Sequence, residues 1–268
     1  MFGWLRRRRP TRTIPEPLWQ AVLARYPFLA QRAAADVERL RALAAEFLAT
    51  KEFHGAHGFQ ITDAVALAIA AQAVLPILHL GQPHEPRSAL RWYDDFVGIV
   101  VHRGEVVAHR ETMDEQGIVH RYDEVLAGEA MERGPVMLNW RDVASAGRTA
   151  GQGYNVVIHE FVHKIDMRDG AADGCPPLVS RDTRRAWFAV LQPAYEAFCE
   201  QVVIAERFGG EVPWLDPYGA ESIAEFFAVA CEAYFVNRGR FSQEFATLVP
   251  LFDGFFRPNE PAALANQA

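Results

Sequence analysis

The chain has 268 residues and a mass of 30.0 kDa, and 50% of its residues are hydrophobic, which is enough for a packed core and excludes a disordered chain. A formal net charge of −7, with charges of both signs interspersed, excludes the basic face that nucleic-acid binding requires. The three cysteines form no CxxC pair, which excludes a disulfide framework and a cysteine-rich zinc module and indicates a cytoplasmic protein.

The N-terminal sequence MFGWLRRRRP has a twin-arginine pattern, but no apolar segment follows the arginines, so we expect no export. The longest apolar run, residues 64–81, is interrupted by Gln72, Pro76 and His79, which is typical of a buried helix rather than a membrane span. The sequence therefore predicts no transmembrane segment and no membrane partner.

Apolar residues recur every three or four positions between residues 18 and 53, which predicts helices that the Tyr26-Pro27 pair divides. Asp63 is the expected N-cap of the next, apolar helix, which Pro76 bends or ends. We therefore expect residues 1–90 to form an N-terminal helical region that packs on the rest of the chain.

Short β-branched runs follow, FVGIVVHRG, EVVAHRE and GPVMLNW, and they predict a small mixed sheet. Helical spacing returns at 153–167, 181–208 and 220–237, while 257–268 are expected to form a loose tail. This order of elements predicts the α+β class. Residues 135–140 are a candidate for an edge strand on which a peptide could lie.

The stretch GYNVVIHEFVHKID raises the question of a metal site, because His159 and His163 lie four residues apart. On a helix this spacing places both imidazoles on one face, where they can bind the same ion. Glu160 is turned by about 100 degrees and can reach a water held by that ion without binding the ion itself. The pattern predicts a metal-binding helix, although an HExxH pattern also occurs by chance.

Catalytic zinc usually has three protein ligands. The sequence offers no histidine six residues after His163, where Asp169 stands, so the third ligand is expected among Glu221, Glu225 and Glu232. Glu225 fits best because it can point inward beside the apolar pair that follows it, whereas Glu221 suits a solvated position. Asp166 shares the face of both histidines and is expected to accept the second imidazole N–H of a ligand.

NVVIHEFVHKIDMRDG, with GPVMLNWRDV before it and LDPYGAESIAEFFAVACEAYF after it, closely resembles the Mlc titration factor A family of zinc metallopeptidases. A more distant similarity is to the catalytic domain of anthrax lethal factor, in the pattern HEFxHxxD followed by YGxxxxxEFFA. The resemblance implies a zincin-like metallopeptidase domain over 91–256 with an HExxH active-site helix. It also implies one zinc ion held by His159, His163 and Glu225, with Glu160 as the catalytic glutamate.

Tyr218 matches a tyrosine near the zinc in the distant relative, and we expect its hydroxyl to stabilise the oxyanion of the reaction. The alternative is a tyrosine that only packs at a helix entry. The resemblance further implies a zinc-dependent peptidase with aminopeptidase-type activity on peptide substrates. A regulatory protein that captures a transcriptional repressor of the Mlc type is the second hypothesis, and the presence of the non-ligand Glu160 favours the enzyme.

Overall fold

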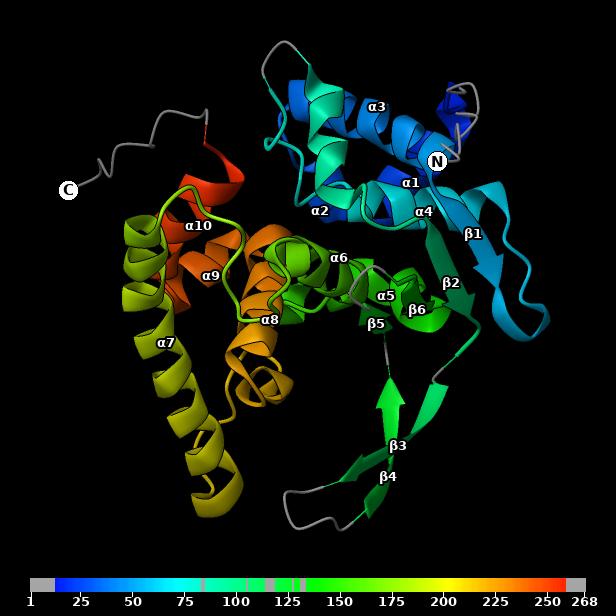
Figure 1. The fold of residues 1–268 in the computed structure, drawn as a ribbon. Helices are drawn as coiled ribbons and strands as arrows, with labels where there is room; N and C mark the ends of the chain where they lie inside the picture. The colour runs from blue at the N-terminus through cyan, green and yellow to red at the C-terminus, as the bar shows by residue number, and fades with distance from the viewer. Residues whose placement is uncertain are drawn as a thin grey trace, which may run out of the picture.

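Helices form most of the computed structural model, which describes residues 13–82, 85–104, 106–113, 119–126, 128–130 and 134–258. The twin-arginine segment and residues 259–268 of the expected tail lie outside the described residues. Figure 1 shows α1 to α4 together on one side of α6, and α7 to α10 on the other. The α+β class predicted from the sequence is confirmed, and helices dominate it.

The bounds of the α-helices in the described part of the chain are α1 (Glu16–Arg25), α2 (Pro27–Ala30), α3 (Ala34–Thr50), α4 (Asp63–Ala73), α5 (Trp140–Thr149), α6 (Val156–Asp166), α7 (Arg181–Phe208), α8 (Ile223–Val236), α9 (Arg238–Glu244) and α10 (Leu248–Phe256). Those of the strands are β1 (Glu52–Gly55), β2 (Gly98–His102), β3 (Val106–Met113), β4 (Val119–Leu126), β5 (Gly128–Ala130) and β6 (Val136–Asn139).

The break at Tyr26-Pro27 that the sequence predicts is present, and a second, unpredicted break after Ala30 separates α2 from α3. Tyr26 leaves the helical conformation, and Pro27 opens α2 at a position where its missing N–H costs no hydrogen bond. The predicted cap of α4 is wrong by one residue: Thr62 is the N-cap, and its hydroxyl accepts the Val65 N–H at 3.2 Å. Asp63 is instead the first helical residue, where its negative charge interacts favourably with the positive end of the helix dipole.

The main sheet has the strand order β1-β2-β6-β5 among the described residues. β1 and β6 run parallel to β2, and β5 runs antiparallel to β6, so the predicted mixed sheet is confirmed. The expectation that 135–140 form an edge strand is wrong, since β6 lies between β2 and β5. The chain between β2 and β6 forms the β3-β4 hairpin and returns as β5, which covers the outer side of β6 and becomes the edge itself.

The N-terminal helices pack closely on the later part of the chain. The Tyr26 hydroxyl donates to the Val143 carbonyl of α5 at 3.0 Å. A Cβ at Gly147 would lie 2.0 Å from the carbonyl oxygen of Arg25, so only glycine allows α5 to approach the end of α1 this closely. Buried apolar residues from both parts belong to one hydrophobic cluster. The division at residue 90 stays a prediction.

α6 lies in the middle of the molecule, between α4 and α8, and β5 also contacts it (Figure 1). Its apolar side chains, among them Ile158, Val162 and Ile165, are fully buried, as their spacing predicts. This packing holds α6 on several sides. The polar side chains on α6 are therefore held in fixed positions.

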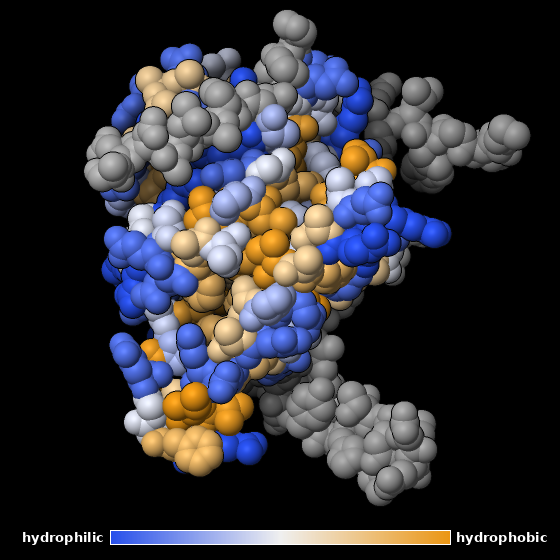
Figure 2. Space-filling view, turned by 90° about the vertical axis from the view of Figure 1, so that its left-hand side faces the viewer, coloured by the Kyte–Doolittle hydropathy of each residue, from blue (hydrophilic) through white to orange (hydrophobic). Residues whose placement is uncertain are grey.

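The surface of α7 is partly apolar. Figure 2 shows apolar side chains over the middle and the lower end of the face that α7 forms. Ile204 and Phe208 near the end of α7, and Val212 just beyond it, are exposed. No helix in the described part of the chain is both long and apolar enough to cross a membrane.

Candidate metal centre

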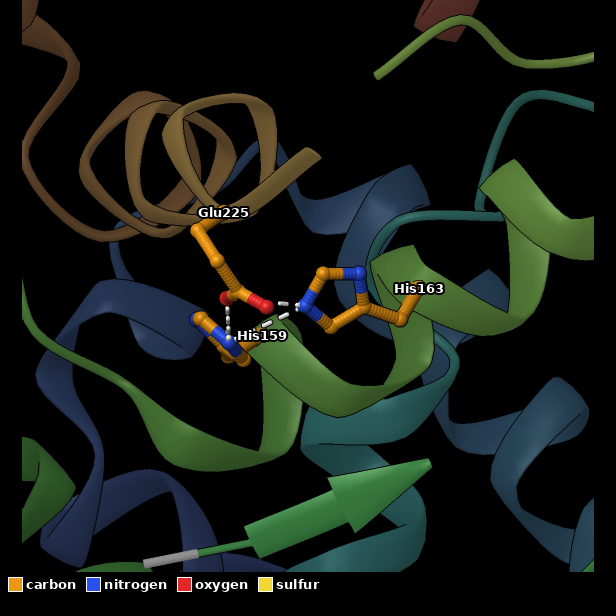
Figure 3. A group of neighbouring side chains, drawn as sticks. All are labelled: His159, His163 and Glu225. Carbon is orange, nitrogen blue, oxygen red and sulfur yellow. Dashed lines mark hydrogen bonds and ion pairs between the residues drawn. The ribbon is translucent and has the colours of Figure 1, made fainter. Parts of the chain in front are cut away.

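α6 begins at a residue that both caps the helix and belongs to the site. Asn155 is the N-cap, and its side-chain oxygen accepts the Ile158 N–H at 3.0 Å. The helix then places His159 and His163 one turn apart on the face toward α8, with their ring centroids 4.7 Å apart. Both imidazoles lie at the contact between the two helices (Figure 3).

α8 supplies the carboxylate that completes the group. Ser222 caps this helix by accepting the Glu225 N–H at 3.1 Å, so Glu225 lies in the first turn. Its Oε2 atom lies 3.1 Å from Nε2 of His159 and 3.2 Å from Nε2 of His163, and the two Nε2 atoms are 3.2 Å apart. Of the three carboxylates that the sequence offered, Glu225 is the one with an oxygen beside both histidines, whereas Glu221 is exposed.

These three atoms fit a tetrahedral zinc ion. Zinc binds imidazole nitrogen and carboxylate oxygen at about 2.0–2.2 Å, which places neighbouring ligand atoms about 3.3 Å apart in a tetrahedron. The separations of 3.1 and 3.2 Å lie close to that value. The two histidines and one glutamate also match the ligand set of a catalytic zinc site with an open fourth position. The donor set therefore suits the ion predicted from the sequence.

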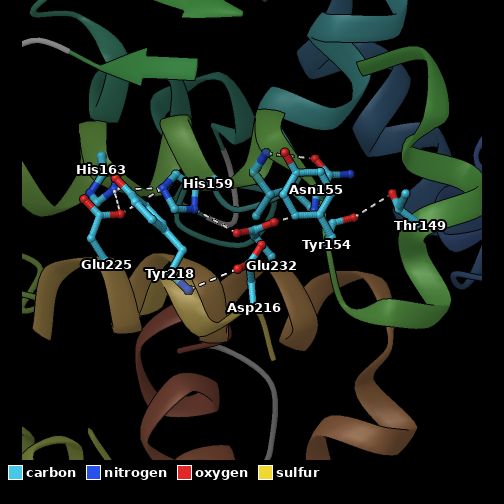
Figure 4. A network of polar contacts seen from close by, with 10 residues as sticks. Thr149, Tyr154, Asn155, His159, His163, Asp216, Tyr218, Glu225 and Glu232 are labelled. Carbon is cyan, nitrogen blue, oxygen red and sulfur yellow. Dashed lines mark hydrogen bonds and ion pairs between the residues drawn. The ribbon is translucent and has the colours of Figure 1, made fainter. Parts of the chain in front are cut away.

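Glu232, two turns after Glu225, determines which nitrogen of His159 is available to bind a metal ion. Its Oε1 lies 2.8 Å from Nδ1 of His159 (Figure 4). A carboxylate at this position accepts the Nδ1–H, which leaves the lone pair of a neutral imidazole on Nε2. His159 is thus prepared to bind a cation through the atom that faces Glu225.

A polar network extends from Glu232 to the N-terminal helices. The other carboxylate oxygen of Glu232 accepts the backbone N–H of Asn155, and the Asn155 side-chain amide donates to Oε1 of Gln72 at 2.8 Å. The amide group of Gln72 donates to the Ala68 carbonyl at 3.0 Å within α4. Gln72, Asn155 and Glu232 are all buried, so each of these hydrogen bonds replaces water that the groups have lost.

The electrostatics of the group favour a cation. Burial lowers the pKa of His159, but hydrogen bonds with Glu225 and Glu232 outweigh it and leave that pKa well above its ordinary value. For Glu225, burial raises the pKa, yet the hydrogen bonds with His159 and His163 bring it below the ordinary value. Burial lowers the pKa of His163. The neighbouring carboxylates thus favour positive charge at His159, and this is the charge that a cation bound there would supply.

The two predicted catalytic residues lie beside the group. Glu160 is the next residue on α6 after His159, and its side chain is 4% exposed. Tyr218 lies on a short 3-10 helix, Pro217–Ala220, where its backbone N–H donates to Oδ1 of Asp216 at 3.0 Å. Its ring extends over His159, with the ring centroids 6.1 Å apart, and 37% of the residue is exposed (Figure 4). Tyr218 therefore lies at the solvent side of the cluster.

Asp166 ends α6 in a buried position. Its Oδ2 accepts the Gly174 N–H at 2.9 Å, which joins the end of α6 to the loop that follows. Burial raises the pKa of this carboxyl to about 7. The partner of the His159 Nδ1 atom is Glu232, so the predicted contact of Asp166 with a ligand imidazole stays a prediction. Glu232 is a candidate from the sequence only as a metal ligand. Gln72 is not predicted as a partner, although its polar amide within an apolar run was the available evidence of one.

Comparison with known proteins agrees with this geometry. The family model of the glucose-regulated metallo-peptidase M90 matches residues 2–257. Mlc titration factor A of Edwardsiella ictaluri is 34% identical over 258 residues, which cover 96% of this chain and 93% of that protein. The protein of the same name from Serratia proteamaculans is 32% identical over 247 residues, which cover 92% of this chain and 88% of that protein. The one from Escherichia fergusonii is 30% identical over 266 residues, which cover 99% of this chain and 95% of that protein. The predicted kinship with Mlc titration factor A is confirmed, and the chain belongs to the M90 family of metallopeptidases.

Proposed function

We propose that this protein is a zinc-dependent peptidase whose centre is the group formed by His159, His163 and Glu225. The observation that supports it most directly is the convergence of three ligand-type atoms, at separations close to those of a zinc tetrahedron, beside the buried Glu160. In this proposal the fold is zincin-like, residues 91–256 form the catalytic domain, and α6 is the active-site helix.

The chemistry follows from the position of each group. A single zinc ion bound there would supply Lewis-acid chemistry, since it acidifies water and polarises a carbonyl group. Glu160 accepts the proton of the attacking water and delivers it to the leaving amine. The Tyr218 hydroxyl donates a hydrogen bond to the oxygen of the substrate carbonyl as negative charge develops there. Its place at the solvent side of His159 supports this role.

Two further carboxylates position the centre in this proposal. Glu232 holds the His159 ring by accepting its Nδ1–H, and it also fixes the start of α6 through the Asn155 N–H. Asp166 holds the other end of α6 through its bond to Gly174, one turn after His163. Together they fix the active-site helix at both ends.

The substrate we propose is a peptide that lies along β5. This strand is an edge of the main sheet in the described part of the chain, and it contacts α6. An extended peptide can add to such an edge through backbone hydrogen bonds, which brings its carbonyl groups toward the active-site helix. The family resemblance of the sequence is the basis on which we propose aminopeptidase-type activity, in which the substrate has a free N-terminus.

Hydrolysis of amino-acid nitroanilides and of longer peptides by the purified, zinc-loaded protein tests this function. Each peptide is offered with a free and with an acetylated N-terminus, which separates aminopeptidase from internal cleavage. Glu160→Gln, at matched zinc content, is the control and is expected to lose hydrolysis because Gln cannot accept the proton. Equal hydrolysis by both proteins would refute the role of Glu160, and no hydrolysis by the zinc-loaded wild type would refute the peptidase.

The second function we propose is capture of a transcriptional repressor of the Mlc type. The names of the relatives, Mlc titration factor A, support it. The test is titration calorimetry with a purified Mlc-type repressor, using both the wild type and Glu160→Gln. Binding by both proteins would establish a regulatory function that is independent of hydrolysis, whereas no binding would refute it.

A further inference from the structure

A polar cavity lies away from the metal centre. Its volume is about 570 Å³, and it lies where the turn between α2 and α3 meets the junction of α8 and α9. The charged residues that line it are Arg32, Asp36, Arg238 and Arg257. The proposed peptidase mechanism uses none of them.

The lining includes three guanidinium groups and one carboxylate, although the whole chain has a formal net charge of −7. Asp36 also lies 3.5 Å from Nε2 of His79, so its charge is shared with a second partner. Asp253, just outside the lining, pairs with Arg238 at 2.7 Å. In the part of the chain that the structure describes, the lining of this cavity therefore holds more arginines than carboxylates, although the chain as a whole is acidic.

Two of these arginines, Arg32 and Arg238, each have a buried hydrogen-bond donor without an acceptor among the described residues. Arg32 donates through Nη2 to the Phe235 carbonyl at 2.9 Å, but its buried Nε has no partner among the described residues. Within the same part of the chain the buried Nη1 of Arg238 also has none. Burial, together with the charges of Arg257 and Arg238, lowers the pKa of Arg32 to about 10, although the charge of Asp36 opposes this shift. Charged donors buried without acceptors are costly, so this arrangement favours an anion.

The remaining lining is suited to an organic group. The guanidinium of Arg238 lies over the Tyr234 ring, 4.7 Å from its centroid, and its side chain stays 36% exposed. Phe28 and Phe235 add apolar surface to the same cavity. Guanidinium groups bind phosphate through paired N–H donors. A site with several guanidinium groups suits the two negative charges of a phosphate better than the single charge of a carboxylate.

We propose that this cavity binds the phosphate group of a small phosphorylated molecule. The phosphate oxygens accept hydrogen bonds from Arg32, Arg238 and Arg257, and the organic part lies against the aromatic side chains. Asp36 accepts from a donor on that organic part. This site is independent of the peptidase function, because its residues lie outside the metal centre.

A purely structural role is the competing explanation. Arg32 donates a hydrogen bond to a carbonyl at the end of α8, and its positive charge interacts favourably with the negative end of the helix dipole. One arginine satisfies that need. The structural role supplies no acceptor for Nη1 of Arg238 among the described residues.

Titration calorimetry on the full-length protein tests the proposal, with phenyl phosphate and inorganic phosphate as probes and sodium chloride at matched ionic strength as the blank. The two phosphates distinguish an organic ligand from free phosphate. We expect saturable 1:1 binding of phenyl phosphate that Arg238→Gln and Arg257→Gln each weaken about tenfold or more, the effect of losing one charge-assisted hydrogen bond. Arg240→Gln is the matched control, because Arg240 lies on α9 outside the lining and pairs with Glu244.

Circular dichroism of each variant shows whether it is folded, and Arg238→Lys, which keeps the charge but not the paired donors, is expected to bind with intermediate affinity. No saturable binding to the wild type up to about 10 mM would overturn the proposal. Equal binding by the wild type and both glutamine variants would also overturn it, since the phosphate would then bind elsewhere, for example at the metal centre. Equal weakening by Arg240→Gln would indicate general attraction to positive charge and would overturn it as well.

Discussion

Replacing the buried Asp166 with Asn should change how stability depends on pH. Burial raises the pKa of this carboxyl from 3.8 to about 7, and the Gly174 N–H bond opposes that rise only in part. In the unfolded chain the pKa returns to 3.8, so between pH 3.8 and 7 the folded state binds a proton that the unfolded state has released. The stability from the protonated carboxyl is therefore complete below pH 3.8 and is lost as the pH rises to 7.

The size of the effect follows from the separation of the two pKa values. About three pH units at about 1.4 kcal/mol each give an upper limit of about 4 kcal/mol of unfolding free energy lost between pH 4 and pH 8. Asn does not ionise, so the variant does not lose unfolding free energy in this way as the pH rises. Relative to the wild type, the unfolding free energy of the variant should therefore rise by up to about 4 kcal/mol between pH 4 and pH 8. A change in packing adds a difference that does not depend on pH, so it does not affect this comparison.

Urea unfolding at several values between pH 4 and pH 8, with EDTA present, measures this difference without the pH dependence of metal binding. Asp182→Asn is the control, because it makes the same chemical change at a side chain that is 87% exposed. Parallel stability curves for the wild type and Asp166→Asn would refute the reasoning. They would mean that Asp166 is ionised in the folded protein throughout this range.

Three further outcomes are expected. Glu232→Gln should weaken zinc binding about 10–100-fold in a competition assay with a chromophoric chelator, because Gln cannot accept from both His159 Nδ1 and the Asn155 N–H; unchanged affinity would refute the positioning role. Tyr218→Phe should lower kcat of peptide hydrolysis by about 10–100-fold at unchanged zinc content, and equal turnover would remove Tyr218 from the mechanism. Gly147→Ala should destabilise the fold by about 1–3 kcal/mol in urea unfolding, with Gly239→Ala, where a Cβ meets open space, as the control.

The geometry around the metal could largely be predicted from the sequence. The four-residue spacing of His159 and His163 determines that they share a helical face, since helix geometry is local. Glu225 was favoured for its place before an apolar pair, and Phe226 and Phe227 are indeed fully buried. The helices with clear apolar periodicity and the mixed sheet were predicted for the same reason. Local periodicity is sufficient wherever one face of an element is buried.

The partners of the histidines could not be predicted in this way. Asp166 and Glu232 each have a spacing compatible with a contact to His159, and the choice depends on how α6 packs against α8. Similarly, the edge of the main sheet depends on where the chain returns after the β3-β4 hairpin, which no local pattern specifies. β1 was missed because its four residues directly follow a long helix and show little alternation of burial.

The polar network connects the N-terminal helices to the metal centre. Gln72 lies on α4, in the region before residue 90, and its Oε1 accepts from the amide of Asn155, the residue that caps α6 and donates its backbone N–H to Glu232. Loss of this acceptor would leave a buried amide unpaired, at a cost of about 1–3 kcal/mol, at the start of the helix that supports both histidines. The N-terminal helices are therefore part of the structure that positions the site, even though none of their residues lies in the metal group.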